Sequence, residues 1–205
     1  MVLPTVVSRD DVDEKTLIEI AEACQVSSYQ IEDIYACTPL QSRSMAESAI
    51  NSGASVFQFV LSLGPPVDID RWCAAFGQVV SLNSVLRTRL VDCRLGLVQV
   101  VMSKMHYTER RTGDVEQYMR DDKAQPLDLG VPLFRSVIIN RKWVLTMHHA
   151  VMDHSSLASL FRHVINIYHG QAPETRSPSQ EDSLKEYILM LQYSGRRADL
   201  AENYG

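Results

Sequence analysis

A histidine pair and a nearby aspartate are the residues of this chain best placed to do chemistry. His148 and His149 end the apolar run that begins at Trp143, and Asp153 comes four residues after His149. An imidazole can accept or release a proton at physiological pH. A carboxylate at this spacing can return toward the histidines and fix an imidazole tautomer, or pair with an arginine elsewhere. We therefore predict proton-transfer chemistry in the segment Lys142–Ser156.

The two histidines cannot have the same role. Adjacent residues of a strand point to opposite faces, so His149 continues the face of Trp143 and Met147, and His148 the face of Thr146. One histidine should point into the protein and be held there, while the other can point into a cleft. The alternative is that both are core histidines whose ring nitrogens are satisfied by hydrogen bonds.

Other chemistries fit the segment less well. A metal site made of His148, His149, Asp153 and His154 has suitable donor atoms, but adjacent strand residues diverge, and we expect no metal. A nucleophilic triad lacks a serine in a Gly-x-Ser-x-Gly turn, and no cysteine has a visible partner. Direct transfer, in which a histidine removes a proton from an incoming nucleophile, needs neither a metal nor a covalent intermediate.

The composition excludes several protein classes. The chain has 205 residues, of which 45% are hydrophobic and 22% charged, as in ordinary globular proteins. A net charge of -5 without basic clusters argues against nucleic-acid partners. No apolar run approaches the roughly 20 residues of a membrane span, and the N-terminus lacks the pattern of a secretory signal. The four cysteines show no paired spacing, so we predict buried, reduced thiols in a cytoplasmic protein.

Helical and strand-like periodicities alternate along the chain. The pattern predicts helices at 13–24, 39–51, 69–83, 114–124, from Ser155 or Ser156 to Tyr168, and at 181–193. It predicts strands at 55–63, up to Cys93, 96–102, 133–140 and 141–148, with a turn or helical fragment at 27–35, an irregular segment at 104–113 and a linker at 171–180. This alternation favours a layered α/β or α+β domain over residues 13–205, preceded by a leader at 1–12.

Several segments together resemble one protein family. The segment Met147–Asp153 resembles the His-His-x-x-x-Asp-Gly signature of condensation domains in non-ribosomal peptide synthetases, shared with chloramphenicol acetyltransferase-like acyltransferases. Other motifs occur in the family's order: Thr38–Gln41 with its fungal-type lead-in Ile31–Tyr35, Leu86–Thr88, Pro126–Leu129 and Pro132–Arg135. The resemblance covers residues 14–204.

The resemblance implies an α/β (α+β) sandwich, the chloramphenicol acetyltransferase-like N-terminal lobe of a condensation domain. Such a domain has two lobes with a tunnel between them. The phosphopantetheine arms of a donor and an acceptor peptidyl carrier protein enter the tunnel from opposite ends, and the reaction joins an acyl or peptidyl thioester to an amine as an amide. No cofactor is expected to bind this chain directly.

The resemblance also implies roles for single residues. His149 is the residue that deprotonates or orients the attacking amine. His148 and Asp153 are chiefly structural, and Asp153 is expected to pair with Arg87. Loss of Asp153 is then expected to damage folding at least as much as catalysis.

The chain departs from the family pattern at two points. His154 stands where the family has glycine, and we expect it, with Ser156, near the substrate channel. The alternatives for His154 are a solvent-facing or helix-cap role and a role as a second acid-base group. The length matches only the N-terminal lobe, so the C-terminal lobe is expected to be absent and the isolated lobe inactive. A cyclising, ester-forming or epimerising relative, and a non-catalytic carrier-docking lobe, remain alternatives.

Overall fold

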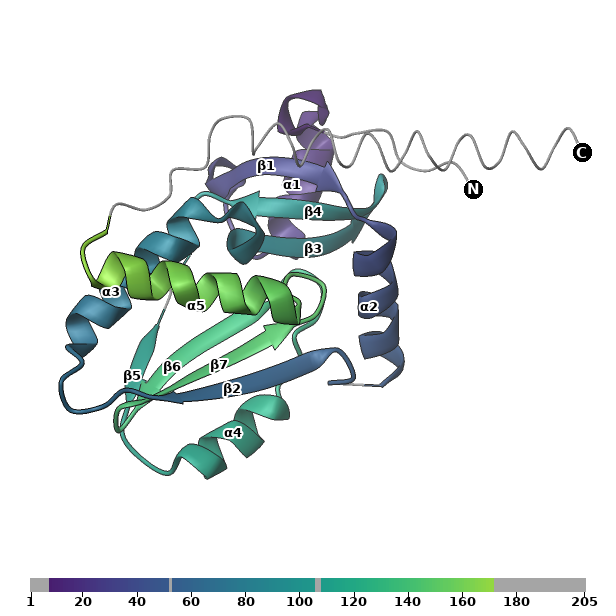
Figure 1. Cartoon of the computed structure of the whole chain (residues 1–205). Coiled ribbons are helices and arrows are strands. Elements are labelled where there is room, and N and C mark those ends of the chain that lie inside the picture. The colour runs from purple at the N-terminus through teal and green to yellow at the C-terminus, as the bar shows by residue number, and fades with distance from the viewer. Residues whose placement is uncertain (1–7, 52, 106–107, 172–205) are drawn as a thin grey trace, which may run out of the picture.

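The computed structural model describes residues 8–51, 53–105 and 108–171 and confirms a layered α/β (α+β) arrangement (Figure 1). The side chains of His154 and Ser155 lie outside this description. The helices are α1 (Glu14–Ala23), α2 (Pro39–Ile50), α3 (Ile69–Leu82), α4 (Val115–Lys123) and α5 (His154–Tyr168). The strands are β1 (Ile31–Ala36), β2 (Val56–Ser62), β3 (Thr88–Cys93), β4 (Gly96–Met102), β5 (Glu109–Arg111), β6 (Phe134–Ile139) and β7 (Lys142–His148).

The strands form two separate sheets. The first sheet has the order β1-β4-β3 and is antiparallel throughout. The second has the order β2-β7-β6-β5, in which only β5 and β6 run parallel. The histidine strand β7 therefore lies inside its sheet, where Val56 of β2 fixes the register of His148. Hydrogen bonds on both sides hold such a strand in place.

Helices cover both faces of the second sheet (Figure 1). Trp143 and Met147 pack in one core with residues of α3 and α5, among them Phe76 and Val164. On the opposite face Val144 packs in a smaller cluster with residues of β6 and α4. The predicted alternation of β7 is thus confirmed, because both of its faces are buried by different helices.

The predicted helix starts are confirmed by their caps. Asp13, Thr38, Asp68 and Asp114 each accept a hydrogen bond from the backbone N–H three residues later. These bonds satisfy one of the N–H groups that a helix leaves unpaired at its first turn. The turn that joins β6 and β7 has Asn140 at φ 46° and Arg141 at φ 67°. Positive φ at both central residues is the geometry of a type I′ hairpin turn.

Three local predictions were wrong. Ile31–Tyr35 belongs to strand β1. The segment has no clear period of its own, and hydrogen bonding to β4 holds its backbone in the strand conformation. The segment 104–113 contains the short edge strand β5, which is entirely exposed and carries no apolar alternation. Asp153, and not a serine, caps α5. The predicted helix at 181–193 and the linker from 172 onward lie outside the described residues.

The first sheet packs against α1 through a core that includes Ile20, Ile34 and Val98. Within the predicted leader, Arg9–Asp11 forms a single 3-10 turn, and the Arg9 backbone N–H donates to Asp33 of β1 over 3.1 Å. Among the described residues, no helix is both long enough and apolar enough to cross a membrane.

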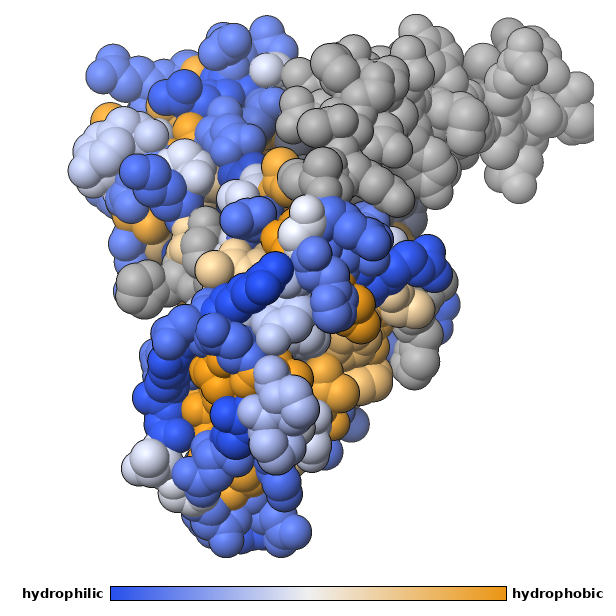
Figure 2. Space-filling view, turned by 60° about the vertical axis from the view of Figure 1, so that its left-hand side comes forward, coloured by the Kyte–Doolittle hydropathy of each residue, from blue (hydrophilic) through white to orange (hydrophobic). Residues whose placement is uncertain are grey.

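Large apolar side chains also remain on the surface. Leu40 and Ile50 of α2 are 68% and 88% exposed, and Val60 and Leu61 of β2 are partly exposed. Figure 2 shows one face of the molecule, on which apolar residues gather in patches bordered by polar ones.

Candidate active site

The two adjacent histidines have opposite environments. His148 is fully buried, with 0% of its surface exposed, whereas His149 is exposed. This is the difference that strand alternation predicted. The exposed imidazole can meet a substrate, and the buried one cannot.

Hydrogen bonds fix the protonation of His148. The Ala150 backbone N–H donates to Nδ1 over 3.0 Å, so this nitrogen carries no proton. The proton of the neutral ring is then on Nε2, which lies 2.8 Å from the Ser48 hydroxyl and donates to it. Burial, and next the nearby His149, lower the pKa of His148 to about 4, against a weak opposing effect of Asp128. His148 is therefore a neutral imidazole that holds the chain in place directly after His149.

Ser48 is a residue that sequence reasoning missed. It lies on α2, 100 residues before His148, and no motif or period connects the two. The helix places it because Thr38 and Pro39 set where α2 begins, and both were recognised. The only sequence signal was that a buried histidine needs some polar partner.

Strand β2 positions His149. The His149 backbone N–H donates to the Ser55 carbonyl over 2.8 Å, one residue before β2 begins. The imidazole packs on the Phe57 ring, with 4.6 Å between ring centroids and 50° between planes. The ring is thus supported on one side by an aromatic face and remains accessible to solvent.

The expected pairing of Asp153 with Arg87 is wrong. Arg87 is buried, and its guanidinium donates to the Glu32 carboxylate of β1 and to the Met102 carbonyl. Asp153 is exposed and caps α5, accepting from the Ser156 backbone N–H over 2.7 Å. The physical reason is position: Arg87 ends the 3-10 turn that leads into β3, and a glutamate on the same sheet is its nearest carboxylate.

The start of α5 borders an apolar recess. Ser156, predicted near the substrate channel, lines a recess of about 200 Å³ together with Val151 and Met152 from the segment that follows His149. The rest of its wall comes from α3, the turn after it and α5: Val79, Asn83, Val85, Leu86, Ser159, Leu160 and His163. His154 is the first residue of α5, and its side chain lies outside the described part of the structure.

The arrangement of His148 and His149 supports proton transfer by an imidazole. Within the described residues, no three His, Cys, Asp or Glu side chains are placed to hold a metal ion. What the site presents is one exposed imidazole on a backbone held by a neutral imidazole, and the segment that follows it, Val151 and Met152, lines the recess. Such a group can act as a general base toward a nucleophile bound next to it.

Comparison with known proteins shows a family likeness over most of the chain. A family model described as Condensation domain matches residues 31–203. The non-ribosomal peptide synthetase valB of Aspergillus terreus is 45% identical over 124 residues, which are 58% of this chain and 5% of that protein. Nonribosomal peptide synthetase 6 of Cochliobolus miyabeanus is 38% identical over 180 residues, or 84% of this chain and 10% of that protein.

A solved structure agrees in fold. The starter condensation domain of rhizomide synthetase RzmA matches with a TM-score of 0.66 at 22% identity, covering 81% of this chain and 45% of that one. At this identity the likeness concerns the fold alone. The chain spans a tenth or less of these two fungal relatives and under half of the solved domain.

Proposed function

The chain belongs to the condensation-domain family, and from this premise we propose that it is the N-terminal, histidine-bearing lobe of a non-ribosomal peptide synthetase condensation domain. The proposed reaction joins a carrier-bound acyl or peptidyl thioester to a carrier-bound amine. The observation that carries the proposal is the contrast between a buried, neutral His148 and an exposed His149 at the end of the same strand.

His149 is the proposed general base. Its imidazole accepts a proton from the amine as the nitrogen attacks the thioester carbonyl. The tetrahedral intermediate then collapses, the C–S bond breaks, and the departing thiolate takes up the proton. The Ser55 carbonyl holds the His149 backbone and the Phe57 ring supports its imidazole before substrate arrives, which lowers the entropic cost of reaching the reacting geometry.

The recess at the start of α5 is the proposed site for the apolar part of the donor group. Its lining is mainly apolar, and it begins two residues after His149. A mutant of the RzmA starter condensation domain, which has a similar fold, was solved in complex with C8-CoA. Ser156 then borders the donor group.

The proposed partners are the donor and acceptor peptidyl carrier proteins, whose phosphopantetheine arms bring the substrates. A C-terminal lobe supplies the other wall of the tunnel. We place the reaction in the cytosol, because all four cysteines are free thiols.

The test is single-turnover amide formation between loaded carrier proteins, with this chain joined to the rest of a condensation domain. His149→Ala should slow transfer by roughly 10²–10⁴-fold, the usual contribution of general base catalysis. His169→Ala is the matched control, since it removes an exposed histidine at the far end of α5.

Equal rates for His149→Ala and the His169→Ala control would refute the catalytic role of His149. Saturable carrier binding that survives in both variants, with no transfer by the unmodified domain, would instead support a docking lobe.

A further inference from the structure

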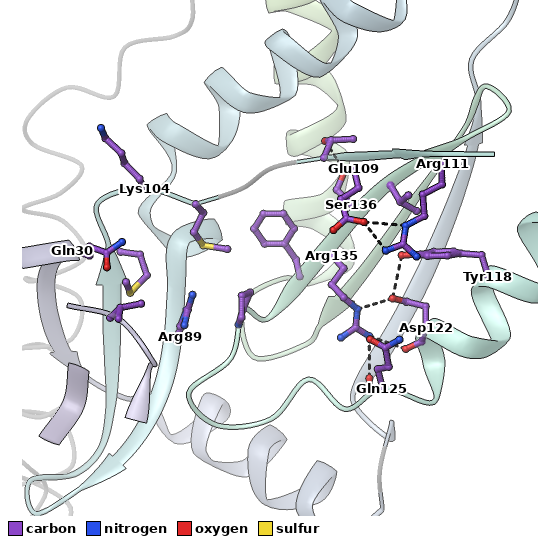
Figure 3. A pocket seen from close by; sticks show the side chains of 17 residues that line it. Gln30, Arg89, Lys104, Glu109, Arg111, Tyr118, Asp122, Gln125, Arg135 and Ser136 are labelled. Atoms are coloured by element: carbon purple, nitrogen blue, oxygen red, sulfur yellow. Dashed lines mark hydrogen bonds and ion pairs between the residues drawn. The ribbon is translucent and has the colours of Figure 1, made fainter. Parts of the chain in front are cut away.

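A second cavity lies between the two sheets. Its volume is about 380 Å³, within the range of small-molecule sites. One wall comes from the first sheet and the segments beside it, and the other from β5, β6 and α4 (Figure 3). None of the residues His148, His149, Asp153 and Ser156 lines it, so it is separate from the candidate active site.

The wall formed by β5, β6 and α4 is electrically balanced. Arg111 pairs with Glu109, and Arg135 pairs with Asp122. Asp122 is buried, which by itself raises its pKa, but hydrogen bonds from Thr146 and Arg135 outweigh this and hold the pKa below its usual value. Each cation on this wall therefore already has its own carboxylate (Figure 3).

The opposite wall carries two cations without a carboxylate. Arg89 and Lys104 form no ion pair with any described residue, and Figure 3 places both on the side of the cavity away from Asp122. The lining thus holds four cations and two carboxylates, although the whole chain is acidic, with a net charge of -5.

The guanidinium of Arg89 is fixed but only partly used. Nη1 donates to the carbonyls of Cys24 and Gly130 over 2.5 and 3.1 Å. Nε is buried and has no hydrogen-bond partner within the described structure. Burial lowers the pKa of Arg89, opposed by a weaker effect of Cys24, but an arginine keeps its charge. The charge that Arg89 adds to this wall is therefore not neutralised by a carboxylate, although its Nη1 is already held by two backbone carbonyls.

The remaining lining is largely apolar. Val26, Met102, Met105, Pro132, Phe134 and Val137 contribute it. Thioethers adapt to irregular shapes, and an aromatic ring stacks on flat groups.

From this lining we infer that the cavity between the sheets binds a small organic anion, whose carboxylate or phosphate lies on the side of Arg89 and Lys104 and whose apolar body lies against Met102, Met105 and Phe134. The inference does not depend on the proposed function.

The test is calorimetric titration of the full chain with phenyl phosphate and with benzoate. Benzyl alcohol serves as the uncharged probe and inorganic phosphate as the probe without an apolar body. We expect saturable binding of one or both aromatic anions, and at least roughly tenfold weaker binding of the other two probes. A preference between the two anions identifies the headgroup.

Lys104→Gln should weaken binding roughly threefold, as for one exposed ion pair, and Lys104→Glu further. Lys123→Gln is the matched control, because Lys123 is also exposed and does not line the cavity. Arg89→Gln should weaken binding more, provided that its circular dichroism and melting curve show a folded chain. The two Lys104 variants keep the test decisive if Arg89→Gln does not fold.

The indole N–H signals in a ¹⁵N correlation spectrum show whether the probe binds in this cavity. Trp143 Nε1 donates to Ser136, which lines the cavity, over 2.9 Å, whereas Trp72 does not line it. Binding should shift the Trp143 signal more than the Trp72 signal. The inference is overturned if no probe binds, if benzyl alcohol binds as well as the anions, or if Lys104→Gln and Lys123→Gln bind alike.

Discussion

His148 illustrates at the residue scale how a buried imidazole can support an exposed one. The ring accepts from Ala150 and donates to Ser48, so all of its polar atoms are satisfied only in the neutral form. Because Ala150 directly follows His149, this bond restrains the backbone that carries the proposed base.

Ser48→Ala should destabilise the fold by about 1–3 kcal/mol, because it leaves the buried Nε2–H of His148 without an acceptor. Urea unfolding measures this change. Ser42→Ala on the same helix is the control, since its hydroxyl donates only to a local carbonyl, and it should cost no more than ~0.5 kcal/mol. Equal losses for the two variants would contradict the assigned role of Ser48.

His148 also predicts a pH dependence of stability. Its pKa is about 4 in the folded chain, against the ordinary histidine value of 6.5 once the chain unfolds, so between these values the unfolded chain binds more protons. The neutral His148 therefore contributes its full share to the free energy of unfolding above pH 6.5. This share, ~3 kcal/mol in total, is lost as the pH falls toward 4. Urea unfolding between about pH 4 and 7 should show a shallower dependence of stability on pH for His148→Gln, and an unchanged dependence would refute the prediction.

At the element scale, the start of α5 and the turn before β3 are held by different polar contacts. Asp153 caps the helix from an exposed position, and Arg87 ties its turn to β1 through Glu32. The two residues that were expected to pair therefore stabilise different elements.

Double-mutant cycles test this separation. Asp153→Ala should lower the free energy of unfolding by about 1 kcal/mol, as is usual for a lost helix cap. Asp153→Asn should lower it much less, because asparagine is also a good cap. Arg87→Ala and Asp153→Ala should be additive within about 0.5 kcal/mol, whereas Arg87→Ala and Glu32→Ala should couple by ~0.5–3 kcal/mol. A large coupling between Arg87 and Asp153 would restore the original expectation.

At the scale of the whole molecule, Gly130 joins the connection before β6 to the first sheet and α1. Its N–H donates to the Leu90 carbonyl over 2.7 Å, and its carbonyl accepts from Arg89. Its φ is +76°, and a Cβ at this position would lie 2.3 Å from the Ala23 carbonyl oxygen. Only glycine allows this approach between the two layers.

Gly130→Ala should destabilise the fold at least twice as much as Gly53→Ala. Gly53 has a similar φ of +84° but open space around its Cβ position, so its substitution carries only the backbone strain of ~1–2 kcal/mol. Thermal unfolding compares the two variants. Similar melting temperatures would mean that the Ala23 carbonyl moves aside at little cost.

Local elements could largely be predicted, because their causes lie within a few residues. Caps at Asp13, Thr38, Asp68 and Asp114 depend on neighbours three residues away, and the alternation of β7 separated His148 from His149. Strands β1 and β5 could not, since each is defined by pairing with a distant strand and not by its own pattern.

The sequence by itself determined the starts of α1 to α4, the layered fold class, the family resemblance and the opposite orientation of the two histidines. Only the tertiary structure decided that Ser48 holds His148, that Glu32 and not Asp153 pairs with Arg87, and that Arg89 and Lys104 line the same cavity between the sheets. The reason is separation along the chain. Ser48 lies 100 residues from His148, and Glu32 lies 55 from Arg87, so these contacts exist only once the sheets have formed.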